Sequence, residues 1–229
     1  MSEPIIDRAH FEAKFPSAKL YGKTLTADRK QGFNAIFDSW DAVESYDSLE
    51  WLAYELATAW HETGGRMQPV REGFATSDAG AYTAVTKYCK AQGIYNYAAR
   101  HTNGNSYYGR GYVQLTHAVN YKKMGKHFGL GDTLYANPDK VLDPHTGAKI
   151  LIHGMMDGLF RPSKGTLVDY FNGASQRWFE ARDLINGDKD KKPAWTGERR
   201  SERSSPITAR HLFPCFATSE CRRRDATIR

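Results

Sequence analysis

Two glutamates, ten positions apart, are placed where acid–base chemistry could be carried out. Glu62 directly precedes the Thr63-Gly64-Gly65 turn, where a helix is expected to end. A carboxylate is poorly placed at a helix C-terminus, and partial burial there raises a carboxyl pKa, as a general acid requires. Glu72 follows after a short loop. Two carboxyls in different surroundings can split a glycosidic bond, since one protonates the leaving oxygen while the other activates water or attacks carbon.

A plainer interpretation of these acids is also available. Glu62 could be a surface residue at a fraying helix end, because glutamates are mostly exposed. Pairs of acids at this spacing are common by chance. A third segment favours the chemical interpretation.

The segment 107–116 combines three tyrosines, two glycines and one arginine with polar uncharged residues. Tyrosine rings have flat faces with a polar tip and can stack on sugars. Gln114, Thr116 and the nearby Asn120 offer uncharged donors and acceptors that could hold a water or a sugar hydroxyl. The alternative is a glycine-rich hairpin whose tyrosines serve packing.

Together these segments resemble the family 19 glycoside hydrolases, which comprise chitinases and related lysozyme-like endolysins of phages and bacteria. The resemblance covers residues 25–190, and its motifs stand in the order that the family uses. The matching motifs are His61-Glu62-Thr63-Gly64-Gly65, Met67 to Glu72, Tyr107 to Thr116 with Asn120-Tyr121, and Ile185-Asn186-Gly187.

The resemblance implies a role for each matching site residue. Glu62 corresponds to the general acid and, by similarity to compact bacterial members, Glu72 to the general base. Thr116 would hold the attacking water, and Asn186 would bind that water or the substrate. Neither a metal nor an organic cofactor is required. The residues expected to bind substrate are His61, Tyr108, Arg110, Gln114, Asn120 and Asn186.

The implied reaction is inverting hydrolysis of β-1,4 bonds between N-acetylated amino sugars, with the carboxyls about 6.5–9.5 Å apart to admit a water. We expect peptidoglycan as the substrate, as for a bacteriolytic endolysin or muramidase of a phage or bacterium. The short spacing of the acids and the lack of a signal peptide and of a chitin-binding module favour it. Chitin oligomers are the alternative substrate. A non-catalytic protein that binds cell-wall glycans is the alternative of a different class.

Two other hydrolase classes fit the sequence poorly. A zinc protease motif would need a second histidine at position 65, which is Gly65. A thiol amidase would need a reactive cysteine, but Cys89 lies inside an expected helix and is more consistent with packing. Five further histidines show no spacing typical of metal ligands, and we expect them at the surface or satisfied in the interior: His101, His117, His127, His145 and His153.

The composition fits a soluble globular protein of 229 residues with a net charge of +6, and we expect it to be a monomer. The positive charge is compatible with anionic wall polymers, but the basic residues are scattered among acids and do not indicate nucleic acid. No apolar run approaches about 18 residues, so no membrane span is expected. Residues 1–8 lack the features of a secretory signal. We therefore expect synthesis in the cytoplasm, reduced cysteines, and action on the wall after release through a holin or lysis.

The apolar periodicity predicts a mainly α fold with, at most, a small β-hairpin near residues 107–115. The family resemblance adds a lysozyme-like arrangement of two helical lobes around a central cleft. One helix, capped by Thr26, should reach Val43, and another, starting at Asp143-Pro144, should be the central buried helix. The other expected helices span residues 7–15, 48–62, 79–92, 116–128, 165–171 and 176–185.

The chain changes character after residue 192. We interpret residues 1–192 as the catalytic domain and residues 193–229 as a basic tail, with eight arginines and no lysine. Its weak apolar periodicity favours disorder. Two other accounts are open, namely a tail attracted to wall or membrane and a change of reading frame in the gene.

Overall fold

The computed structural model describes residues 6–18, 24–43, 45, 48–173, 175–186, 212, 215 and 216. Within these residues the chain is mainly helical, as the periodicity predicted. Its α-helices are α1 (Arg8–Lys14), α2 (Ala27–Asp41), α3 (Leu49–Glu62), α4 (Asp78–Gln92), α5 (Ala118–His127), α6 (Thr133–Ala136), α7 (Pro144–Met156) and α8 (Leu167–Tyr170). Short 3-10 turns occupy Phe15–Ser17, Glu72–Phe74, Pro138–Leu142, Pro162–Lys164 and Glu180–Leu184.

Capping residues set where several helices begin. The side chain of Thr26 accepts a hydrogen bond from Arg29 N at 3.3 Å, and that of Asp143 accepts one from Thr146 N at 2.8 Å. Each bond satisfies a backbone N–H that has no partner inside the first helical turn. Ser48 holds the capping position of α3 without such a bond.

Helix α3 ends at two glycines whose backbone is in the left-handed conformation. Gly64 and Gly65 have φ of 58° and 70°, and Gly65 N donates to Trp60 O at 2.7 Å. A side chain at either position would be strained, whereas glycine adopts this conformation freely. The turn makes Glu62 the last residue of α3, as the sequence predicted.

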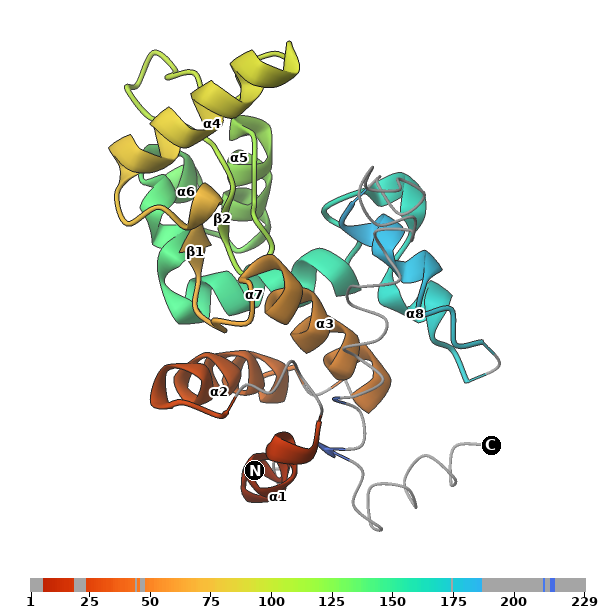
Figure 1. The fold of residues 1–229 in the computed structure, drawn as a ribbon. Coiled ribbons are helices and arrows are strands. Elements are labelled where there is room, and N and C mark those ends of the chain that lie inside the picture. The colour runs from red at the N-terminus through yellow and green to blue at the C-terminus, as the bar shows by residue number, and fades with distance from the viewer. Residues whose placement is uncertain are drawn as a thin grey trace.

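The buried core surrounds α2, α3 and α7. Eight residues of α7 are buried, which confirms it as a central helix. In Figure 1, α4, α5, α6 and both strands group on one side of α7, while α1 and α2 lie on the other side. Aromatic rings of α1 and α2 pack together, for example Phe11 and Phe33 at 4.9 Å between centroids. No helix among the described residues is long and apolar enough to cross a membrane.

The small sheet stays within the prediction of at most a small hairpin, but its two strands come from distant segments. Strand β2 (Arg110–Gly111) pairs antiparallel with β1 (Val70–Arg71), so that Val70 opposes Gly111. Within 107–115 there is an isolated bridge between Arg110 and Leu115. The chain turns back tightly after Gly111, so residues 112–115 form no second strand. The edge of β2 pairs instead with β1, the distant segment that leads to Glu72.

The last two predicted helices are shorter than expected. The segment 165–171 forms only the four-residue α8, and 176–185 forms a 3-10 turn from Glu180 to Leu184. Phe171 and Gln176 form an antiparallel bridge, so the chain reverses between them. That reversal takes the residues next to it out of helical geometry.

Three residues of the segment expected as a disordered tail are packed in the core. Leu212, Cys215 and Phe216 are buried. The ring of Phe216 stacks on Phe11 with centroids 4.9 Å apart. The prediction of disorder therefore does not hold at these three positions, and the rest of 193–229 lies outside the described residues.

Candidate active site

A cavity of about 340 Å³ collects residues from distant parts of the chain. It joins the end of α3 to the segment 113–120 and to the segment 185–186. Of the nine site residues predicted from the sequence, five line it: Glu62, Gln114, Thr116, Asn120 and Asn186. The other lining residues are Tyr97, Val113, Leu115, His117, Phe160 and Ile185.

Glu62 reaches the cavity from the last turn of α3 and is half-buried. The side-chain amide of Asn186 donates a hydrogen bond to its Oε1 at 3.2 Å. This contact joins residues that are 124 positions apart. It fixes the direction of the carboxyl group that the sequence predicted as the acid.

Glu72 is held just behind the cavity wall. Its Oε2 accepts a hydrogen bond from Gly109 N at 2.8 Å, and its Oε1 accepts one from the hydroxyl of Tyr97. Glu72 is not among the lining residues, but Tyr97 is. Burial, together with the hydrogen bond to Glu72 and its charge, raises the pKa of Tyr97. The phenol therefore stays protonated and acts as a donor to the carboxylate.

Hydrogen bonds within the segment 114–120 shape a second wall. The Thr116 hydroxyl donates to Gln114 O at 2.7 Å, and the Asn120 amide donates to Thr116 O at 2.8 Å. The Gln114 amide donates to Val70 O at 3.2 Å. This last bond ties the wall to strand β1, which leads directly into Glu72.

Backbone strain is concentrated at this site. Among the described residues, four that are not glycine have positive φ: Met67, Phe74, Gln114 and His117. Met67 and Phe74 flank the Glu72 loop, whereas Gln114 and His117 line the cavity. Such conformations cost energy in ordinary residues and persist where the surrounding structure enforces them, often at functional sites.

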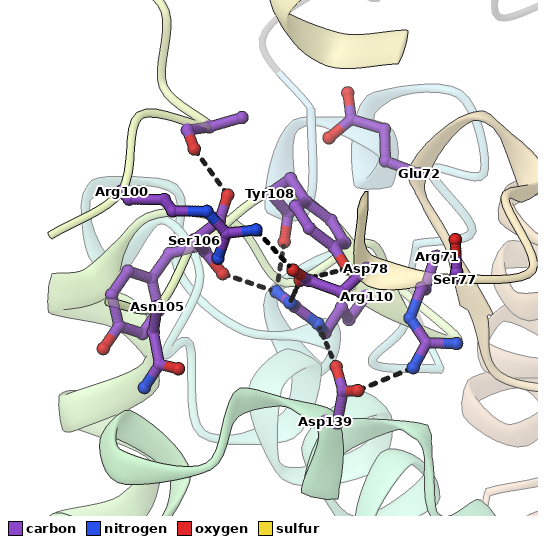
Figure 2. Close-up of polar contacts among 12 residues, drawn as sticks. Arg71, Glu72, Ser77, Asp78, Arg100, Asn105, Ser106, Tyr108, Arg110 and Asp139 are labelled. Carbon is purple, nitrogen blue, oxygen red and sulfur yellow. Dashed lines mark hydrogen bonds and ion pairs between the residues drawn. The ribbon is translucent and has the colours of Figure 1, made fainter. Parts of the chain in front are cut away.

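Tyr108 and Arg110, predicted to bind substrate, lie in the interior instead (Figure 2). Arg110 is 1% exposed and pairs with Asp78 at 3.0 Å and with Asp139 at 2.8 Å. Its guanidinium lies 3.7 Å from the ring centroid of Tyr108, whose hydroxyl donates to Asp78. These two residues therefore build the fold around the site and do not line the cavity, so the structure gives their expected contact with substrate no support.

His61 is the remaining residue predicted to bind substrate. It is half-buried on α3, next to Glu62, and does not line the cavity. The structure thus gives its expected contact with substrate no direct support. The catalytic roles of the residues that do line the cavity remain predictions.

Tyr97 and Phe160 line the cavity, but neither was predicted from the sequence as part of the site. Tyr97 lies in a turn after α4, with no motif around it. Phe160 occupies space left by Gly154 of α7, because a Cβ added at Gly154 would lie 2.1 Å from the Phe160 ring. A glycine in the last turn of a buried helix was a signal for Phe160, since an isolated glycine in a helix often has a packing reason.

Solved structures of similar fold include chitinases. Chitinase C from Streptomyces griseus HUT6037 aligns with a TM-score of 0.58 and 24% identity over 95% of this chain and 79% of its own. A bacterial family 19 chitinase aligns with a TM-score of 0.57 and 25% identity over 94% of this chain and 96% of its own. Their architecture agrees with the mainly helical, lysozyme-like fold expected from the sequence.

Sequence comparisons point the same way. The acidic 26 kDa endochitinase of Solanum lycopersicum is 41% identical over 61 residues, which are 26% of this chain and 24% of that protein. The match therefore spans about a quarter of that relative's length. A family model described as chitinase class I matches residues 26–159. Because that match covers more than half of the 229 residues, this chain belongs to the class I chitinase family, glycoside hydrolase family 19.

Proposed function

We propose that this protein is a glycoside hydrolase that cleaves β-1,4 bonds between N-acetylated amino sugars. The observation that carries the proposal is the meeting of Glu62, Thr116 and Asn186 at one cavity, with Glu72 bonded to its wall through Tyr97. The cavity volume of about 340 Å³ falls in the range of pockets that bind small ligands.

In this proposal the reaction is a single displacement. Glu62 donates its proton to the glycosidic oxygen while the bond from that oxygen to the anomeric carbon breaks. A water molecule attacks the anomeric carbon from the opposite face and gives its proton to Glu72, which inverts the configuration. Thr116 holds the water, and the amide of Asn186 keeps the Glu62 carboxyl turned into the cavity.

Glu72 can accept the proton of the water at a lone pair that its two present donors leave free, since each carboxylate oxygen can accept more than one hydrogen bond. Both carboxylate oxygens accept hydrogen bonds, one from the Gly109 N–H and one from Tyr97. The backbone N–H of Gly109 and the hydroxyl of Tyr97 together hold the carboxylate in place. Catalytic hydrogen bonds often form only when substrate is bound, which fits this arrangement.

For the substrate we propose peptidoglycan, with chitin oligosaccharides as the second candidate. The ten-residue spacing of the two acids resembles the compact lysozyme-like members and supports the first. The names of the relatives, endochitinase and chitinase, support the second. Both polymers contain β-1,4-linked N-acetylglucosamine, and peptidoglycan adds a lactyl-peptide on alternate sugars.

The test compares the wild-type chain and Glu62→Gln on purified peptidoglycan and on chitin oligosaccharides. We expect Glu62→Gln to lower the rate by about 10²–10⁴-fold, because it removes the acid while keeping the shape. Mass analysis of the products identifies the polymer and the bond that is cut. NMR of fresh products should show the α-anomer, as inversion of a β-linkage requires.

Glu50→Gln is the matched control, since Glu50 lies on the same helix but does not line the cavity. Its rate should match that of the wild type. Full activity of Glu62→Gln would eliminate Glu62 as the acid. Retained glycan binding without any product from the wild type would instead establish the binding-protein alternative.

A further inference from the structure

Outside the cavity, two histidines and an aspartate converge at one point of the surface. His127 Nε2 lies 3.0 Å from Asp157 Oδ2, and His153 Nδ1 lies 3.1 Å from the same oxygen. The three atoms all lie within 4.8 Å of one another. Within the described part of the chain, no other group of three such side chains is as close.

We propose that His127, His153 and Asp157 form a binding site for a divalent transition metal, with Zn²⁺ as the best fit. Imidazole nitrogen and carboxylate oxygen are typical zinc ligands. Tetrahedral Zn²⁺ with bonds of about 2.0–2.2 Å places its ligand atoms about 3.3 Å apart. The two nitrogen-to-oxygen distances are already close to that spacing, so small side-chain rotations complete the set. A water takes the fourth position.

Rigid elements hold all three side chains. His127 is the last residue of α5, His153 lies in the last turn of α7, and Asp157 is the residue that caps α7. The ring of Phe128 packs edge-on against both histidine rings, with centroids 5.1 Å and 5.5 Å away. The rings are thus oriented before any ion binds, which lowers the entropic cost of binding.

The electrostatic setting favours a cation. Both α5 and α7 end at this point, and helix C-termini carry partial negative charge from their free carbonyls. The Asp157 carboxylate adds a full negative charge. The three side chains are between 25% and 33% exposed, so an ion and its water can enter from solvent.

The site would join two elements that also carry cavity residues. Asn120 lies two helical turns before His127 on α5, and Phe160 follows Asp157 by three residues. Both line the cavity, whereas none of the three proposed ligands does. The ion would therefore stabilise the walls without taking part in the proposed hydrolysis, which needs no metal.

The test uses the full chain without an affinity tag, treated with EDTA and dialysed. Titration with ZnCl₂ in a calorimeter should show one ion bound per chain, and Tm should rise with ZnCl₂ and fall back with EDTA. Cobalt(II) should give the visible absorption of a tetrahedral site. His127→Gln and His153→Gln should each weaken zinc binding by more than about tenfold.

His145→Gln is the matched control, because His145 is an exposed histidine on the same helix as His153. It should bind zinc as the wild type does. Circular dichroism of the metal-free variants checks that each is folded, and either ligand histidine alone suffices for the test. No saturable zinc binding, or equal binding by the wild type and both ligand variants, would overturn the site.

Discussion

The two halves of the segment 107–116 serve opposite purposes. In the first half, Tyr108 and Arg110 point into the interior and join a network of charges (Figure 2). In the second half, Gln114 and Thr116 line the cavity. The turn after Gly111 separates them, closed by two backbone hydrogen bonds between Arg110 and Leu115. One segment thus contains both buried residues that stabilise the fold and residues that line the cavity.

The network around Arg110 connects the base of this turn to neighbouring elements. Arg110 pairs with Asp78 at the start of α4 and with Asp139, which also pairs with Arg71 of β1 at 2.6 Å. Desolvation acts to raise the pKa of Asp78, but hydrogen bonds from Arg100 and Tyr108 and the nearby positive charges lower it overall. The network therefore links α4, both strands and the 3-10 turn Pro138–Leu142, which precedes α7.

Arg110→Met should have the largest effect, because it removes the central residue of this network. Removing one member of a buried ion pair costs about 3–5 kcal/mol. We expect about 3 kcal/mol, because Asp78 and Asp139 are 37% and 42% exposed and can be hydrated. Urea unfolding measures this loss. Activity per folded molecule at low temperature should change little, since Arg110 does not line the cavity.

Arg100→Met is the control from the same network. Arg100 is 44% exposed and also pairs with Asp78, so its loss should cost less than about 1 kcal/mol. Equal destabilisation by the two substitutions would show that burial of Arg110 carries no special weight. A rise in KM with unchanged stability for Arg110→Met would return Arg110 to the substrate-binding residues.

A second buried ionisable residue, Glu55, has surroundings unlike those of Arg110. Glu55 of α3 is fully buried, and neither carboxyl oxygen has a hydrogen-bond partner among the described residues. Desolvation raises its pKa well above the ordinary value of 4.5. Arg110 is surrounded by partners and stabilises the fold, whereas Glu55 is accommodated only as a neutral acid.

Glu55→Gln should therefore stabilise the protein in a pH-dependent way. Above pH 4.5 the unfolded wild type releases a proton that the folded state retains, so its free energy of unfolding falls by about 1.4 kcal/mol per pH unit. The loss continues until the pKa of the folded state is reached. Glutamine imitates the neutral acid at every pH, so the variant should gain about 2 kcal/mol over the wild type by pH 6.

Chemical unfolding at several pH values measures this difference. Glu12→Gln is the control, since Glu12 is partly exposed and paired with Lys30 at 2.8 Å. A difference between wild type and Glu55→Gln that stays constant from pH 4 to pH 7 would mean that Glu55 is already ionised in the folded protein.

Local signals predicted the helices well, because caps and apolar spacing act over a few residues. Thr26, Asp143 and Gly64 set helix ends as expected. The side-chain directions of Tyr108 and Arg110 could not be predicted, because the acids that attract Arg110 come from other elements. The same holds for His127 and His153, which are 26 residues apart in sequence and meet only where the C-terminal ends of α5 and α7 come together.

On the cavity side, a substitution of Tyr97 should have the smallest of these effects. Its hydroxyl donates to Glu72, and its ring lies 5.8 Å from that of His117 in the opposite wall segment. Hydrogen bonds to charged groups contribute about 1.5–3 kcal/mol, so Tyr97→Phe should lower kcat about tenfold with little change in KM. Tyr88→Phe, at an exposed tyrosine of α4, should leave both constants unchanged. If Tyr97→Phe instead raised kcat, the hydroxyl would be competing with the attacking water for Glu72, and Tyr97 would be a barrier to catalysis instead of a support for the base.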